Sequence, residues 1–227
     1  MTPIAHIETP YRSKFGVPRQ AGLAATEALV VFEPEYRVGE AVRGLDGFDY
    51  VWLLWQFHLN RRGEEKNTGT WSPTVRPPRL GGNKRVGVFA TRSPFRPNPI
   101  GLSSVRLLSV EVQSSRGPLL HIAGADLVDG TPIFDIKPYI PYADAHPDAR
   151  AGFAVDAPER LTVCDPDGHL AALTPSLAAS LRESLSLDPR PHYQHDPQRR
   201  YVMEFDRYEV AFVVEDNVLI ILNVSTN

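Results

Sequence analysis

Residues 102–112 read LSSVRLLSVEV, and this stretch decides the fold because it is the longest of seven short runs with strand composition. The runs are rich in β-branched, aromatic or other apolar residues and are separated by Gly, Pro and Asp. No regular helical pattern lies between them, which favours a mostly antiparallel barrel or sandwich over alternating strands and helices. The other six runs span residues 3–7, 28–33, 51–57, 86–90, 119–123 and 133–136.

The pattern changes in the last third of the chain. It weakens over residues 154–169, where prolines and the pair Asp167-Gly168 predict a boundary. Thr174 is then suited to be an N-cap, and Pro175 is suited to the first position of a helix. Leucines recur every fourth residue from Leu177, which predicts an amphipathic helix. Residues 201–214 and 218–224 predict a hairpin around residues 215–217. We expect two domains, residues 1–155 and a small α+β unit of residues 156–227.

Composition is ordinary for a globular protein, with 42% hydrophobic and 22% charged residues and a net charge of -3. Cys164 is the only cysteine, which excludes an intrachain disulfide and favours a reducing compartment. The first residues lack a basic segment followed by an apolar stretch, so we expect a cytoplasmic protein without a membrane span. His192 and His195 have no third ligand near them, so we expect loop residues rather than a metal site.

Several common catalytic motifs are absent from the sequence. No two glycines are separated by a single residue, so the phosphate turn of dinucleotide-binding folds is missing. The sequence also has neither a Walker loop nor a Gly-x-Ser-x-Gly elbow. These absences argue against the common nucleotide-binding and α/β-hydrolase classes.

A basic zone lies between Lys66 and Val110, where there is no Asp or Glu but there are eight Lys and Arg residues. In a chain of net negative charge this zone predicts a site for a polyanion or a phosphate-bearing ligand. The alternative is that the charges are scattered over solvated faces. Against it, the zone also holds a cluster of prolines, which stiffen loops and so position groups.

Within this zone, residues 92–99 read RSPFRPNP. Two arginines and three prolines in eight residues predict a stiff loop that presents donors to a ligand. A plain connection in which prolines guard a sheet edge is the alternative, but it does not account for so many donors.

Two later segments carry ionisable groups close to strands. Residues 126–132 contain Asp126 and Asp129 in a turn that is either purely structural or a ligand loop for a hydroxylated or cationic group. Lys137 and Tyr139 follow the next strand, where either could assist proton transfer if its pKa were lowered.

Short motifs follow one another along the chain: PRQ (18–20) with Gly22, RGL (43–45), WSPTVRPP (71–78), GGN (81–83), GVFATRSP (87–94), RPNPIG (96–101), residues 126–132, DIKPY (135–139) and DPRP (188–191). Taken together, these motifs resemble the TrmO family of tRNA N6-adenosine methyltransferases, along nearly the whole chain. The resemblance implies a β-barrel domain that binds S-adenosylmethionine, in a homodimer whose subunits share a site, and methylation of N6 of threonylcarbamoyladenosine at position 37 of tRNA, next to the anticodon.

The resemblance also implies which residues contact the cofactor. Leu59 stands where many relatives have a polar residue, and residues 60–70 are longer than a minimal loop of this family. The implied cofactor contacts are Pro18, Arg19, Gln20, His58, Leu59, Arg92, Leu102, Asp126, Leu127, Val128, Asp129 and Gly130.

The implied reaction suggests roles for further residues. A sulfonium cation favours carboxylates and aromatic faces, and Asp126, Asp129 and Phe95 are candidates. The carboxylate of threonylcarbamoyladenosine suits a guanidinium, for which Arg19, Arg92 and Arg96 are candidates. Asp135, Lys137 and Tyr139 are the candidate catalytic residues, because each could accept the proton that leaves the nitrogen. Contacts to RNA are expected from Arg76, Arg79, Lys84, Arg85, Arg96, Arg190, Arg199 and Arg200.

Two other hypotheses remain open from the sequence. The chain could be a non-enzymatic module that binds S-adenosylmethionine or RNA, or a methyltransferase with a different acceptor. Turnover on tRNA separates the first from an enzyme, and mass spectrometry of anticodon-loop fragments separates the second.

Overall fold

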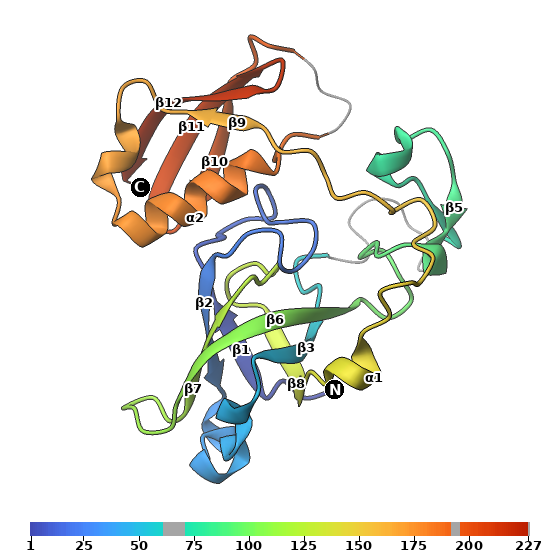
Figure 1. Ribbon diagram of the computed structural model, residues 1–227, viewed down its shortest axis with the longest axis vertical. Helices are drawn as coiled ribbons and strands as arrows, with labels where there is room; N and C mark the ends of the chain where they lie inside the picture. Colours follow the sequence, from blue (N-terminus) through green and yellow to red (C-terminus); the bar gives the residue numbers. More distant parts are fainter. Residues whose placement is uncertain (61–70, 192–195, 227) are drawn as a thin grey trace.

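The computed structural model describes residues 1–60, 71–191 and 196–226. Lys66, the long loop over residues 61–70, His192 and His195 lie outside the described residues. Figure 1 shows a barrel with blue to green strands and a second layered unit with orange to red elements, joined by a gold linker that we define as residues 145–161.

Six strands close the barrel, and every neighbouring pair in it is antiparallel. Inward-facing residues alternate along each strand, so one face of every strand contributes to a single apolar core that includes Ile7, Leu53 and Val105. The strands are, in their order around the barrel, β1 (Ala5–Glu8), β2 (Glu27–Phe32), β7 (Leu119–Ala123), β6 (Ile100–Glu111), β3 (Tyr50–Gln56) and β8 (Pro132–Pro138).

Residues 86–90 were expected to form one of seven barrel strands, and this prediction is wrong. Only β5 (Val86–Gly87) is extended, and it pairs with β4 (Thr74–Val75) in a separate two-stranded sheet. Residues 88–90 instead form a 3-10 turn that buries Val88. Prolines around this segment remove amide donors and prevent longer pairing. Residues 71–99, which we call the arm, therefore project beside the barrel.

Short helical elements fill the remaining connections. They are the 3-10 helices η1 (Pro34–Tyr36), η2 (Gly39–Val42), η3 (Leu45–Gly47), η4 (Pro78–Leu80), η5 (Val88–Ala90) and η6 (His169–Ala172), and the short helix α1 (Pro141–Asp144).

The second unit packs helix α2 (Pro175–Ser186) on a four-stranded sheet of order β10-β11-β12-β9. The predicted N-cap is confirmed, because the Thr174 side chain accepts a hydrogen bond from the Leu177 amide. Two details were not predicted. The run 201–214 is itself a hairpin, which turns at Asp206 with φ 54°, and the expected boundary segment contains a strand parallel to β12. The strands are β9 (Thr162–Cys164), β10 (Tyr201–Phe205), β11 (Tyr208–Glu215) and β12 (Val218–Thr226).

The predicted fold class, a mostly β chain with an antiparallel barrel first and a small α+β unit last, is confirmed. Tyr11 joins the two units, because it is 1% exposed, packs in the second core and bonds through its hydroxyl to Thr26 and to Ser184 of α2, both at 2.8 Å. No helix among the described residues is long and apolar enough to cross a membrane.

Candidate functional site

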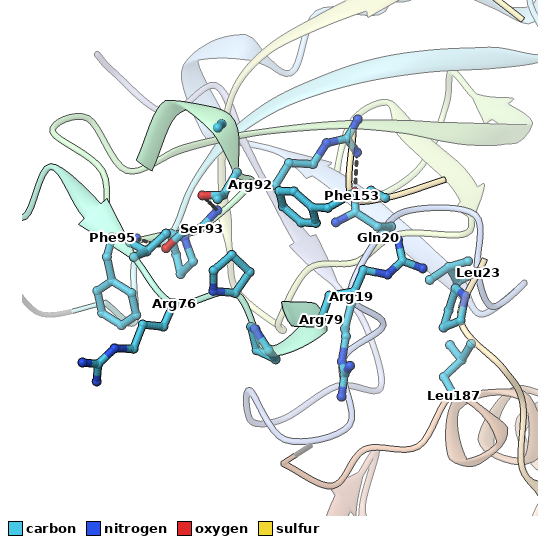
Figure 2. Close-up of a pocket in the computed structure, with 18 of the residues that line it drawn as sticks. Arg19, Gln20, Leu23, Arg76, Arg79, Arg92, Ser93, Phe95, Phe153 and Leu187 are labelled. Carbon is cyan, nitrogen blue, oxygen red and sulfur yellow. Dashed lines mark hydrogen bonds between the residues drawn. The ribbon is translucent and has the colours of Figure 1, made fainter. Parts of the chain in front are cut away.

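A cleft of about 2580 Å³ opens where the barrel, the arm, the linker and the second unit meet. It is larger than the roughly 300–1,000 Å³ of a typical small-molecule pocket, so it has room for a cofactor and part of a larger ligand. Figure 2 shows residues from the arm on one side of it and Leu23 and Leu187 on the other. The lining residues extend in sequence from Lys14 to Asn217, so distant segments of the chain line one site.

Basic side chains outnumber acidic ones along the cleft. Guanidinium groups hold their charge at any physiological pH and bind carboxylates and phosphates in pairs of hydrogen bonds. The cleft is therefore suited to an anionic ligand. Its basic residues are Lys14, Arg19, Arg76, Arg79, Arg85, Arg92, Arg96, Arg160 and Arg190, and its acidic residues are Asp156, Glu159, Asp188 and Asp216.

Four of the predicted cofactor contacts, Arg19, Gln20, Leu59 and Arg92, line the cleft together. Arg92 Nη1 donates a hydrogen bond to Gln20 Oε1, which links the arm to the loop after β1 (Figure 2). Arg19 Nη2 donates to the carbonyl oxygens of Asp188 at 3.4 Å and Arg190 at 3.2 Å. The second unit thus helps to hold a residue of the predicted cofactor site.

Asp126 ends a chain of hydrogen bonds that begins inside the barrel. Trp55 Nε1 donates to Ser103 Oγ at 2.9 Å, and Ser103 Oγ donates to Asp126 Oδ1 at 2.5 Å. Burial raises the pKa of Asp126, and the hydrogen bond from Ser103 and the nearby charge of Arg92 oppose that rise only in part. A carboxylate in this setting gains from a cationic ligand, since a positive charge would offset its lost hydration.

The rest of the 126–130 loop is mainly structural in its contacts. Leu127 is 0% exposed and belongs to the barrel core. Asp129 accepts hydrogen bonds from the Thr9 amide at 3.0 Å and from Arg12 at 2.5 Å, so its carboxylate ties the loop to the N-terminal segment. The Val128 carbonyl oxygen accepts the Thr131 hydroxyl, and Gly130 adopts φ 72°, the left-handed turn conformation that favours glycine.

Residues 92–99 hold their shape through their own hydrogen bonds. Arg96 Nη1 donates to the carbonyl oxygens of Thr91 at 2.9 Å and Ser93 at 3.3 Å. The Ser93 and Phe95 amides donate to the hydroxyls two residues before them. Hydrogen bonds within the loop therefore hold it in one conformation. Arg96 both makes such bonds and lines the cleft.

The remaining predicted cofactor contacts are more dispersed. Pro18 is buried beside Arg19, and Leu59 is 41% exposed and lines the cleft. His58 precedes it, and partial burial lowers the pKa of its imidazole, which keeps the ring neutral near pH 7. Leu102 is 56% exposed on the outside of the barrel and is not among the lining residues.

The three candidate catalytic residues lie on that same outer face. In the barrel register Leu54 of β3 pairs with Leu102 of β6 on one side and with Asp135 of β8 on the other. Leu102, Leu54 and Asp135 therefore form one row across these strands. Lys137 pairs with Asp135 in a salt bridge of 3.0 Å, and the Tyr139 ring contacts Trp52 with 5.7 Å between centroids. Asp135, Lys137 and Tyr139 do not line the cleft of their own chain.

The predicted RNA contacts divide into two groups. Arg76, Arg79, Arg85, Arg96 and Arg190 line the cleft, whereas Lys84, Arg199 and Arg200 are exposed outside its lining. Arg190 is only 8% exposed, and its Nε and Nη2 donate to the Asp188 carboxylate at 2.8 and 2.9 Å. Burial alone would raise the pKa of Asp188, but the hydrogen bonds and charge of Arg190 outweigh it and lower that pKa.

Two regions of the chain match known family domains. Residues 6–145 match the tRNA-methyltransferase O N-terminal domain, and residues 167–227 match the TrmO C-terminal domain. The chain belongs to the TrmO family. The predicted resemblance is thereby confirmed.

Individual TrmO relatives match most of the chain. A tRNA (adenine(37)-N6)-methyltransferase of Escherichia coli is 44% identical over 224 residues, 94% of this chain and 92% of the relative. A protein of the same name from Eikenella corrodens is 48% identical over 77% of this chain and 95% of its own length. The crystal structure of TrmO from Pseudomonas aeruginosa superimposes with a TM-score of 0.78 at 32% identity, covering 99% of this chain and 96% of that one.

Some residues of this TrmO-family site carried no usable signal in the sequence. Ser103 looks like any strand serine, and only the register of β6 brings it to Trp55 and Asp126. Phe153 and its neighbours in the linker line the cleft although nothing in their composition distinguishes them (Figure 2). No group of three or more His, Cys, Asp or Glu suited to a metal ion occurs in the part of the chain that the structure describes.

Proposed function

We propose that this chain is an S-adenosylmethionine-dependent methyltransferase that methylates N6 of adenosine 37 in tRNA, and that its substrate is the threonylcarbamoyl form of that adenosine. The observation that carries the proposal is the convergence of Arg19, Gln20, Arg92 and Arg96 in one cleft with excess positive charge. Both the cofactor and the modified base carry a carboxylate, and the cleft offers separate guanidinium groups for the two.

The cleft fits the cofactor in charge and in size. In this proposal Arg92, which bonds to Gln20, binds the carboxylate of the methionyl group. Asp126, which lies near Arg92 but is not among the residues that line the cleft, offers a negative charge for a cation beside it. When bound, S-adenosylmethionine supplies a methyl group that passes from its sulfur to the nitrogen, which gives up its proton. The enzyme's task is to hold the two ligands in line and to exclude other acceptors.

Proton acceptance in this proposal is assigned to one of the outer-face residues Asp135, Lys137 and Tyr139. These residues can act only if a second subunit brings them to its partner's cleft. The outer face is suited to such contact because the strands there expose Ile100, Leu102 and neighbouring apolar side chains. We therefore include in the proposal a homodimer that buries this face, with Leu102 reaching the partner's cofactor, in the cytoplasm.

Methyl transfer from labelled cofactor tests the proposal. The purified chain is incubated with tRNA from cells that make the threonylcarbamoyl modification and with tRNA from cells that lack it. The proposal predicts label only in the first. Label in neither supports a non-enzymatic binding module, and equal label in both contradicts the proposed substrate. A Leu102→Glu variant followed by sedimentation tests the dimer, which should dissociate to monomer.

A further inference from the structure

Three large aromatic side chains of the arm stand exposed on the rim of the cleft. Trp71 is 47%, Phe89 71% and Phe95 68% exposed, and all three line the cleft. The rings of Trp71 and Phe89 lie 5.7 Å apart at 37°, so they form one apolar surface. Rings of this size cost free energy when they face water, and a group of them marks a contact site.

The backbone keeps these rings exposed. Phe89 follows Val88, which is 0% exposed and anchors the turn, and the Thr91 hydroxyl donates to the Val88 carbonyl oxygen at 2.8 Å. The Phe95 amide is held by Ser93, and Pro94 fixes the backbone between them. The rings are thus presented by a preorganised loop, which lowers the entropy cost of binding.

Charge identifies the partner. The exposed guanidinium groups of Arg76 and Arg85 belong to the same arm, and Figure 2 shows Arg76 beside Phe95 at the end of the cleft away from Leu187. The described part of the arm contains no Asp or Glu. Flat rings combined with positive charge on a segment without acidic residues are the usual means of binding single-stranded nucleic acid, in which unpaired bases stack on aromatic faces and phosphates pair with arginines.

Building on the function proposed above, we infer that Trp71, Phe89 and Phe95 form a stacking platform for unpaired bases of the tRNA anticodon loop. The platform would hold the bases beside the target adenosine while Arg76 and Arg85 bind the adjoining phosphates. This assigns Phe95 to the RNA rather than to the sulfonium. Bases stack on any aromatic ring, so the platform needs rings and not a particular residue type.

Leucine and tyrosine substitutions test the platform. Phe89→Leu, Phe95→Leu and Trp71→Leu keep apolar bulk but remove the ring, whereas Phe89→Tyr and Phe95→Tyr keep it. Tyr142→Ala is the matched control, since Tyr142 is 91% exposed and lies outside the cleft lining. Binding is measured with an anticodon stem-loop RNA carrying 2-aminopurine in the loop, with a fully paired RNA of equal charge as the comparison, and cofactor binding is measured separately.

We expect each leucine variant to bind the stem-loop at least about fivefold more weakly, and to lose quenching of the 2-aminopurine. Binding of the paired RNA and of the cofactor should stay as in the unmodified protein, and the tyrosine variants should restore loop binding. Leucine variants that bind and quench like the unmodified protein, or that bind both RNAs equally poorly because they have become monomers, would overturn the platform. Failure of the unmodified protein to methylate tRNA would instead refute the proposed function.

Discussion

Replacing Ser103 by alanine tests whether the barrel interior controls the charge of Asp126. Ser103 is 2% exposed and stands between Trp55 Nε1 and Asp126 Oδ1. Alanine removes a hydrogen bond to a carboxylate and leaves the indole N–H of Trp55, itself 5% exposed, without its acceptor. A bond to a charged group contributes about 1.5–3 kcal/mol and an unsatisfied buried donor costs about 1–3 kcal/mol, so the two together predict a loss of about 2.5–6 kcal/mol.

The loss should depend on pH in a definite direction. The folded-state pKa of Asp126 already lies above its ordinary value, so ionisation of this group disfavours the fold as pH rises from the unfolded pKa through the folded one. Ser103→Ala raises that pKa further. The difference in free energy of unfolding between the variant and the unmodified protein should therefore grow from acid to neutral pH in urea titrations.

Ser104→Ala is the matched control, because Ser104 neighbours Ser103 on the same strand but is half-buried and faces the opposite side. It should change the free energy of unfolding by less than about 0.5 kcal/mol at every pH. If Ser103→Ala behaves like this control, or if its cost is the same at acid and neutral pH, Ser103 does not control the charge of Asp126.

Three further outcomes follow from the contacts of the site. Gly101→Ala should destabilise the chain by about 1–3 kcal/mol in urea unfolding, because the added methyl carbon would lie 2.2 Å from the buried Trp55 ring. An unchanged free energy of unfolding would show that the ring can move. Arg92→Ala should weaken cofactor binding by calorimetry, whereas Arg79→Ala should mainly weaken tRNA binding in a salt-dependent way, and the reverse pattern would contradict this division of roles. Asp188→Asn should cost about 1–2 kcal/mol at neutral pH. Since the pKa of that carboxyl is lowered in the fold, its contribution is present above its unfolded pKa and disappears as pH falls through the folded one, so a cost that persisted at acid pH would argue for a role other than charge.

Much of the fold was predictable because local composition determines it. Leu119–Ala123 matches its predicted bounds, and the cap at Thr174 is a local interaction. The strand predictions were wrong where strand pairing depends on residues distant in the sequence. Residues 86–90 have strand composition, but the barrel closes when β8 pairs with β1, and the arm is left outside it. The turn at Asp206 lacks glycine or proline, so the sequence around it looks like one continuous strand.

The site was predictable in its residue types more than in its contacts. Arg19 and Arg92, which the resemblance implied as cofactor contacts, line one cleft, and their contact with a cofactor stays a prediction. The sequence could not show that the Asp129 carboxylate forms a salt bridge with Arg12, which lies 117 residues earlier. Nor could it show that Arg190 is buried against Asp188. Such pairings arise only from tertiary packing, which leaves each of these groups less available to a ligand than its position in a motif suggests.

The most direct test of the account is the mass of the modified adenosine at position 37 in tRNA from cells that lack the gene for this chain. Mass spectrometry of anticodon-loop fragments should find threonylcarbamoyladenosine lighter by one methyl group than in the parent cells. Returning the unmodified gene should restore the methyl group, and returning the Arg92→Ala gene should not. Full methylation at position 37 in the cells that lack the gene would contradict the account.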